Sequence, residues 1–284
     1  MHYLSTERDL LATPRATSSS ALIVGRPAFE ATSVRVRTTN ATRSGCDATG
    51  TLHFNDLPGT GREALDVSRL WQAEGGSHAD VLTGAAATET ALKRSLADRR
   101  VVHLATHGFF LSSGCVPGRS NSRGVGGLVS ADAIAAAELE NPLLLSGLAM
   151  AGANRSGRRS VDQDDGILTA EEIAGLDLQD TEWAVLSACD TGLGEIRAGE
   201  GVFGLRRAFQ IAGARTVIMS LWSVDDEATR VWMRALYDGR LARRLDTADA
   251  VREASLSVLR QRRAAHQSTH PFYWAAFVAA GDWR

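Results

Sequence analysis

The sequence predicts an α/β protein with a mostly parallel central β-sheet and helices on both sides. Short apolar runs that end in Gly, Ser or Asp alternate with longer stretches of helical periodicity, as in repeated strand–helix–strand units. The chain has 284 residues, of which 44% are apolar and 23% are charged. A chain of this size and composition can bury a substantial core, so we expect a globular protein.

Seven apolar runs have the length and composition of buried strands. They are Ala21–Gly25, Asp80–Thr83, Arg100–Thr106, Leu143–Leu148, Trp183–Ala188, Thr216–Leu221 and Phe277–Ala280. Helical periodicity separates them as crossover connections should, and several of these helices begin after a capping residue such as Thr169 or Asp225. The predicted helices are Arg62–Ala73, Thr88–Ala97, Ala170–Ala174, Val202–Ala212, Glu227–Gly239 and Ala248–Arg263.

Three stretches rich in Gly, Ser, Arg or Asn interrupt this alternation, and we predict surface loops there. They are Arg37–Gly50, Gly114–Gly127 and Gly152–Gly166. We find no domain boundary within residues 21–284, whereas residues 1–20 read as a short leader or the remnant of an upstream region.

Composition excludes several classes of partner. The 31 basic and 33 acidic side chains give a net charge of −2, so the chain as a whole favours neither nucleic acid nor an anionic membrane. Glu7, Arg8 and Asp9 interrupt the N-terminus where a signal peptide would be apolar. The most apolar run, Pro142–Ala151, is about half of the roughly 20 residues that cross a bilayer. We expect a cytoplasmic protein with no membrane span.

The three cysteines point to the same compartment. Cys46, Cys115 and Cys189 are an odd number, lie far apart and form no C-x-x-C pair of the zinc or dithiol type. A reduced, cytosolic setting is therefore the default expectation.

Two predicted strands run directly into reactive side chains. The run from Val101 to Thr106 is followed directly by His107-Gly108, and the run from Trp183 to Ala188 is followed directly by Cys189. Ligands of open parallel sheets bind beyond the carboxyl ends of the strands, which is where both side chains would lie. A nearby imidazole can take the thiol proton, and the backbone N–H groups of Gly108 and Cys189 can form an oxyanion hole. Taken singly, however, a buried Cys is usually an inert core residue and a strand-end His is often only hydrogen-bonded.

The segments around these two residues resemble the signature blocks of the CHAT domain family. This family comprises caspase-like and separase-like cysteine peptidases that often accompany tetratricopeptide repeats. Nearly the whole chain takes part in the resemblance. The matching segments are Val102–Phe110, Asn141–Leu148, Asp165–Ile173, Leu186–Gly194, Gly199–Leu205, Ala212–Ala214, Ser220–Asp226 and His270–Phe277.

The resemblance implies a caspase-like three-layer sandwich in which His107 is general base and acid and Cys189 is the nucleophile. It assigns the oxyanion hole to the N–H groups of Gly108 and Cys189, and it requires neither metal nor organic cofactor. Asp190 stands where relatives more often carry Glu. The resemblance also suggests a tetratricopeptide-repeat protein or domain as a partner.

Caspase-like relatives outside the true caspases commonly cleave after basic residues, which an acidic side chain near the site would recognise. Four acids in loops at the carboxyl edge of the sheet are candidates: Asp165, Asp190, Asp225 and Asp226. Capping of the following helix is the alternative role for Asp225 and Asp226.

Two other motifs suggest different chemistry. Gly199–Gly204 matches G-x-G-x-x-G, but a dinucleotide loop follows its strand directly, whereas Cys189–Ala198 intervenes here; the glycines are better explained as the start of a helix. His103 and His107 form H-x-x-x-H, but the surrounding residues predict a strand, and Leu104 stands where zinc peptidases need Glu. We expect His103 to be packed in the sheet or hydrogen-bonded to a neighbour.

The sequence therefore leaves two functions open. The first is a cysteine endopeptidase that uses a His107/Cys189 dyad on protein substrates, under the control of a partner or a repeat domain. The alternative is a catalytically idle caspase-like module that acts through interaction or signalling.

Overall fold

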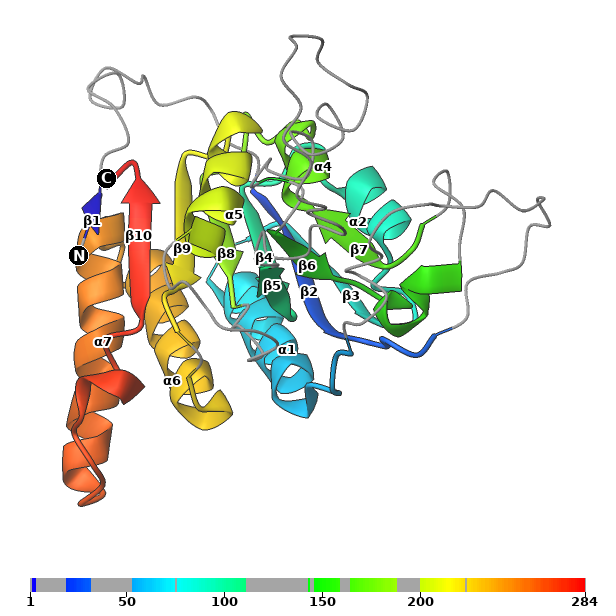
Figure 1. Cartoon of the computed structure of the whole chain (residues 1–284). Helices are drawn as coiled ribbons and strands as arrows, with labels where there is room; N and C mark the ends of the chain where they lie inside the picture. Colours follow the sequence, from blue (N-terminus) through cyan, green and yellow to red (C-terminus); the bar gives the residue numbers. More distant parts are fainter. Residues whose placement is uncertain are drawn as a thin grey trace, which may run out of the picture.

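The structure is a computed structural model of the whole chain (Figure 1). It describes residues 2–3, 19–31, 53–74, 76–110, 143, 146–158, 164–187, 200–222 and 224–283. The predicted loops Arg37–Gly50 and Gly114–Gly127 lie outside these residues.

The central element is a seven-stranded sheet in the order β1-β10-β9-β8-β4-β2-β3. Pairing is parallel from β3 to β9, β10 is antiparallel to β9, and β1 runs parallel to β10. Six of the seven predicted strands lie in this sheet, which confirms the predicted fold class. The strands are β1 (His2–Tyr3), β2 (Ser20–Pro27), β3 (His78–Gly84), β4 (Val101–Ala105), β8 (Trp183–Leu186), β9 (Thr216–Ser220) and β10 (Phe277–Gly281).

Helices cover both faces of the sheet (Figure 1). One face packs against α1 (Pro58–Ala73), α6 (Asp226–Tyr237) and α7 (Thr247–Ala264), and the other against α2 (Glu89–Ser95), α4 (Ala170–Ala174) and α5 (Glu200–Ile211). Successive strand residues point to opposite faces of the sheet. Ile23 and Val185 pack against the first group of helices, and Leu22 and Leu186 pack against the second. Both faces are therefore apolar, which is why the strands read as continuous apolar runs.

Capping residues mark several helix starts as predicted. Thr169 forms a capping box with Glu172 at α4, and Asp225 accepts hydrogen bonds from the N–H groups of Glu227 and Ala228 at α6. Helix α1 begins four residues earlier than predicted, because Pro58 occupies its first turn, where a missing N–H costs nothing. In the described residues the remaining helical turns are two 3-10 helices, Ala153–Arg158 and Pro271–Tyr273, and a π-helix, Asp238–Ala242.

A second, three-stranded antiparallel sheet corrects one strand assignment. The run Leu143–Leu148 was assigned to the parallel sheet, but its strand, β6 (Ser146–Ala149), pairs with β5 (Gly108–Phe110) and β7 (Ile167–Thr169). Leu148 packs in the cluster under α4 and α5, while Ala149 packs in a separate cluster with Phe109. Because both of its faces are covered, β6 has the same apolar pattern as a central parallel strand.

The prediction of a surface loop at Gly152–Gly166 is wrong at both ends. Gly152 and Gly166 are buried with φ of 93° and 80°, in the left-handed region that favours glycine. The Gly152 N–H donates to the Ala28 carbonyl at 3.0 Å, so this glycine makes a turn inside the protein. Arg159 and its neighbours up to 163 lie outside the described residues.

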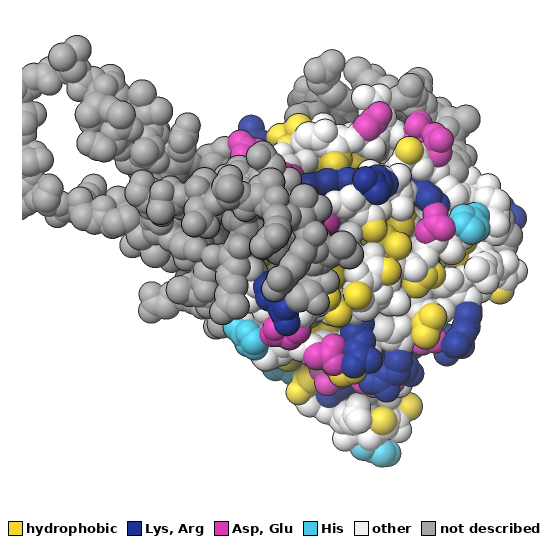
Figure 2. All heavy atoms as spheres, turned by 90° about the vertical axis from the view of Figure 1, so that its right-hand side faces the viewer, with side chains coloured by type: hydrophobic (Ala, Val, Ile, Leu, Met, Phe, Trp, Pro, Cys, Tyr) yellow, Lys and Arg dark blue, Asp and Glu magenta, His cyan; other side chains and the backbone are white. Residues whose placement is uncertain are grey.

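The face of the molecule beyond edge strand β3 carries charges of both signs, interspersed with apolar side chains (Figure 2). On this strand Asp80 pairs with Arg99 and with His78. Among the described helices, none is long and apolar enough to cross a membrane.

Candidate active site

The predicted site lies at the carboxyl edge of the sheet, where β4 ends. β4 lies between β2 and β8, and both neighbours run parallel to it, so all three strands end at the same edge. The Ser187 N–H donates to the Leu104 carbonyl at 3.0 Å, which continues the β4–β8 ladder one residue past β8. Cys189 and Asp190 follow two and three residues later and lie outside the described residues.

His107 is held in a buried aromatic cage directly after β4. It is only 3% exposed, and its ring centroid lies 5.2 Å from that of Phe29 and 5.7 Å from that of Phe54. Its Nε2 lies 2.8 Å from the carbonyl oxygen of Asn55. Because a carbonyl can only accept, Nε2 carries the hydrogen and Nδ1 carries the lone pair. The imidazole is thus fixed in the tautomer that offers Nδ1 as a base.

Burial lowers the pKa of His107 below its ordinary value of 6.5. The hydrogen bond to Asn55 and the negative charge of Asp226 act in the opposite direction and offset part of this effect. The imidazole is accordingly neutral at pH 7, the state in which it can accept a proton.

The residues that hold His107 were not predicted from the sequence. Asn55 contributes only its backbone oxygen, which no side-chain motif can reveal. Phe29 does leave a signal, because it lies two residues after β2 and hence at the same edge of the sheet as His107. Asn154 anchors Phe54: its side chain accepts from the Phe54 N–H at 2.7 Å and donates to the Phe54 carbonyl at 3.0 Å.

Gly108 is the first residue of β5 and pairs with Leu148. The Ala149 N–H donates to the His107 carbonyl at 2.9 Å. Hydrogen-bonded and non-hydrogen-bonded pairs alternate in an antiparallel ladder, so Gly108 occupies a non-hydrogen-bonded pair and its N–H faces away from β6.

The candidate substrate-binding acids lie in different places. Asp225 caps α6 through its side chain, in the alternative role expected for it. Asp165 accepts a hydrogen bond from the Ile167 N–H at 2.9 Å, in the turn before β7. Asp226 lies close enough to His107 to affect its pKa, and a Cβ on Gly59 in the first turn of α1 would come within 2.3 Å of Asp226 Oδ2.

Asp226 has the electrostatic character of a site residue. Burial, Asp225 and Glu63 raise its pKa, while Arg62 and His107 lower it. A nearby positive charge thus stabilises the ionised form of Asp226, whether that charge is an imidazolium or a bound cationic side chain.

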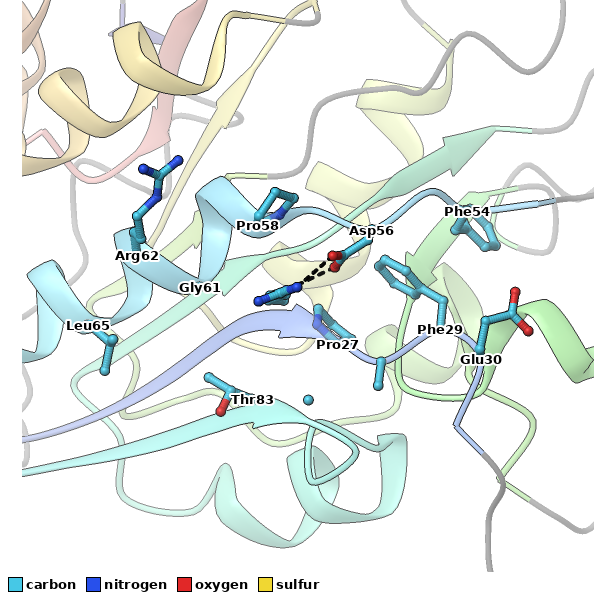
Figure 3. A pocket seen from close by; sticks show the side chains of 13 residues that line it. Pro27, Phe29, Glu30, Phe54, Asp56, Pro58, Gly61, Arg62, Leu65 and Thr83 are labelled. Atoms are coloured by element: carbon cyan, nitrogen blue, oxygen red, sulfur yellow. Dashed lines mark hydrogen bonds and ion pairs between the residues drawn. The ribbon is translucent and has the colours of Figure 1, made fainter.

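A pocket of about 660 Å³ lies beside the histidine cage (Figure 3). Phe29 and Phe54 line both the pocket and the space around His107. Arg26 and Asp56 both line the pocket, and the Arg26 guanidinium makes a double hydrogen bond to the Asp56 carboxylate, at 3.0 and 2.7 Å. This exposed pair lowers the pKa of Asp56 mainly through the hydrogen bond from Arg26.

His103 has the structural role predicted for it. It is buried, and its Nε2 lies 2.9 Å from the Glu63 carboxylate and its Nδ1 3.1 Å from the Tyr237 hydroxyl. His103 and His107 are on β4 and just past it, not on one helix face. Within the described part of the chain, no three His, Cys, Asp or Glu side chains are grouped as metal ligands.

The glycine-rich run after Cys189 begins a helix. Gly201 and Gly204 belong to α5, and Gly204 is buried. Gly199 lies outside the described residues.

A comparison with protein-family models decides the affiliation. The model of the CHAT domain matches residues 1–282. The chain belongs to the CHAT domain family. The resemblance found in the strand-end motifs of this CHAT domain is thereby confirmed.

Two curated relatives are named as tetratricopeptide repeat proteins. Tetratricopeptide repeat protein 28 of Homo sapiens is 33% identical over 116 residues, which are 41% of this chain and 4% of that protein. The Mus musculus protein of the same name is 32% identical over 116 residues, with the same two shares. The CHAT domain chain therefore matches only a small part of these relatives.

Solved structures support the caspase-like fold. The Arg-specific cysteine proteinase gingipain R has a TM-score of 0.52 and 8% identity, over 94% of this chain and 46% of that one. A complex of the Porphyromonas gingivalis RgpB pro- and mature domains has a TM-score of 0.50 and 8% identity, over 94% and 48% of the two chains. At such low identity the likeness shows the fold alone.

Proposed function

We propose that this CHAT domain is a cysteine endopeptidase in which Cys189 attacks a peptide carbonyl and His107 transfers the proton. The observation that carries the proposal is the register between the two strands. From Val101 to Leu104, each β4 residue pairs with the residue 82 positions later, as Val101 does with Trp183 and Leu104 with Leu186. His107 and Cys189 are also 82 positions apart, which supports the proposal that they meet beyond the ends of two neighbouring strands.

Covalent geometry supports this juxtaposition. Cys189 follows Ser187 by two residues, and two residues of extended chain span at most about 7 Å. This short connection supports the proposal that Cys189 lies at the edge of the sheet where His107 lies.

In the proposed reaction Nδ1 of His107 takes the thiol proton, and the thiolate forms a tetrahedral adduct with the peptide carbonyl. The imidazolium then protonates the leaving amine, and water hydrolyses the thioester to release the acyl product and regenerate the thiol. The hydrogen bond from Nε2 to Asn55 keeps the ring oriented through both proton transfers.

For the oxyanion we propose the N–H groups of Gly108 and Cys189. The pairing of β5 supports the first of these, because a Gly108 N–H that faces away from β6 is not used by the ladder. Preorganised backbone donors of this kind typically contribute about 3–4 kcal/mol to transition-state stabilisation.

A preference for basic residues before the scissile bond is part of the proposal. Of the acids considered, Asp225 and Asp165 are engaged with backbone N–H groups of their own segments. Asp226, whose ionised form gains from a positive partner near His107, is the described residue best suited to such a side chain. Asp190 remains a second candidate on sequence grounds.

We also propose a tetratricopeptide-repeat protein or domain as the partner that controls the peptidase. The support is the similarity to human and mouse tetratricopeptide repeat protein 28.

The test is cleavage of a peptide library and of protein mixtures by the parent chain, Cys189→Ala and His107→Ala. We expect cleavage by the parent only, enriched in Arg or Lys before the cut. Cleavage by Cys189→Ala at the parental rate would refute the peptidase mechanism. Failure of all three proteins to cleave, with and without a repeat-containing partner, would favour the idle interaction module.

A further inference from the structure

A buried carboxyl group that the proposed reaction does not use lies between α2 and the second sheet. Glu89, the first residue of α2, is 4% exposed. Its Oε1 accepts a hydrogen bond from the Gly166 N–H at 2.6 Å, and its Oε2 lies 3.2 Å from Lys93 Nζ. Helix α2 thus holds the turn that leads into β7.

Further charged groups face Glu89 from this turn and from α4. The carboxyl groups of Glu89 and Asp164 are hydrogen-bonded to each other, and Asp165 lies close enough to repel a charge on Glu89. Glu172 of α4 also acts on Glu89, and Lys93 is shared between the two, with its Nζ 2.9 Å from Glu172. Lys93 is the sole lysine of the sequence and the only cation within this group of described residues.

A hydrogen bond between two carboxyl groups requires a proton on one of them, and that proton resides on Glu89. Burial, followed by the charges of Asp164 and Asp165, raises the pKa of Glu89 to about 8. Burial also opposes the ionisation of Asp164, but hydrogen bonds from Thr90 and Glu89 outweigh it and lower the pKa of Asp164. At neutral pH the pair is therefore a neutral Glu89 beside an ionised Asp164.

The turn held by Glu89 is connected to the His107 backbone by hydrogen bonds. The Gly166 carbonyl accepts from the Met150 N–H at 2.7 Å, and the Ala149 N–H donates to the His107 carbonyl at 2.9 Å. Gly166 is closely packed against backbone, since a Cβ there would lie 2.4 Å from the Ala153 nitrogen. Displacement of the Glu89–Gly166 contact would consequently be transmitted along β6 to His107 and Gly108.

We propose that Glu89 is a positioning residue that acts in its neutral form. Its hydrogen bond with the Gly166 N–H attaches the second sheet to α2 and so holds His107 and the Gly108 N–H in place. We call this attachment the latch. The role rests on the proposed peptidase function, since it concerns the same histidine and oxyanion donor. Ionisation of Glu89 places a second negative charge beside Asp164 and Asp165 with only Lys93 to balance it, and this weakens the latch.

The direction of the pH dependence follows from linkage. Glu89 binds its proton more tightly in the latched state than in an opened state with an ordinary pKa near 4.5. The latch is strongest below pH 4.5 and weakens as pH rises. The equilibrium constant for opening increases by up to about tenfold per pH unit until pH 8, and above pH 8 it no longer changes.

Hydrogen exchange of the intact chain between pH 5 and 9 tests the latch without requiring activity. The observed amides are those of 146–150 and 164–169, with rates corrected for the intrinsic effect of pH. Glu89→Gln mimics the neutral form, because its amide oxygen can accept from Gly166 and its NH2 can donate to Asp164. Glu89→Ala removes the latch, and Glu171→Gln is the matched control at an exposed acid on α4.

We expect the parent and Glu171→Gln to open more readily as pH rises to 8, Glu89→Gln to stay protected with no such dependence, and Glu89→Ala to be open throughout. In the parent, kcat should fall as pH rises toward 8, and this fall should be absent in Glu89→Gln. Identical pH dependence in the parent and Glu89→Gln would overturn the proposal, as would a Glu89→Gln variant as open as Glu89→Ala at pH 5. If the exchange result holds while no variant cleaves, the latch stands and the peptidase function fails.

Discussion

Phe54→Ala perturbs the cage around His107 and should change both stability and the pKa of the imidazole. Phe54 is 2% exposed, with its ring centroid 5.7 Å from that of His107 and 6.0 Å from that of Phe109. Truncation of a buried Phe to Ala typically destabilises a protein by about 3–5 kcal/mol. Because burial is the main cause of the lowered pKa of His107, the entry of water should raise that pKa toward 6.5.

Stability should respond to pH in a corresponding way. In the parent chain the pKa of His107 is lower in the folded state than in the unfolded state. As pH falls below 6.5, the unfolded state therefore binds a proton first, and the free energy of unfolding decreases until pH reaches the lowered pKa of the folded state. This contribution is fully present above pH 6.5. In Phe54→Ala the slope of unfolding free energy against pH in this window should be shallower.

The assay combines urea unfolding with an NMR titration of the His107 ring protons, assigned by comparison with His107→Gln. Phe272→Ala is the matched control, because Phe272 is 43% exposed and should change neither quantity appreciably. Phe54→Leu is the milder substitute if the alanine variant does not fold. A stability loss without any rise in the pKa of His107, in either Phe54 variant, would refute the inference that this cage desolvates the imidazole.

Two further predictions concern neighbouring charges. Asp226→Asn should lower the pKa of His107, because the negative charge of Asp226 raises it; the same titration measures the shift, and an unchanged or raised pKa would contradict the assignment. His103→Leu should reduce the free energy of unfolding by about 3–5 kcal/mol in urea denaturation, because it leaves the buried Glu63 without its imidazole partner; an unchanged midpoint would argue against a structural role.

The sequence was informative where buried strands and helix caps set the fold. β4 and β8 are buried along their whole length, so they appear as apolar runs bounded by His107 and Cys189, and the parallel arrangement follows from the helices between them. Thr169 and Asp225 were recognisable as helix starts because capping is a local interaction.

Non-local features left no such pattern. β5 and β7 have three residues each and form by pairing with β6. Such short strands are too short to show a periodic pattern in the sequence. The Asn55 carbonyl holds His107 through a backbone atom that every residue has. Glu89 and Asp164 are far apart in the chain, and only the packing of the second sheet on α2 brings their carboxyl groups together.

Site-specific trapping of Cys189 tests the central claim most directly. The intact chain and His107→Ala would be treated with a peptidyl acyloxymethyl ketone carrying a basic residue next to the reactive group, and each cysteine peptide would be quantified by mass spectrometry. Cys46 and Cys115 serve as internal controls in the same molecule. We predict rapid modification of Cys189 alone in the parent and slow modification in His107→Ala. Equal labelling of the three cysteines, or a Cys189 that reacts as fast without His107, would contradict the dyad.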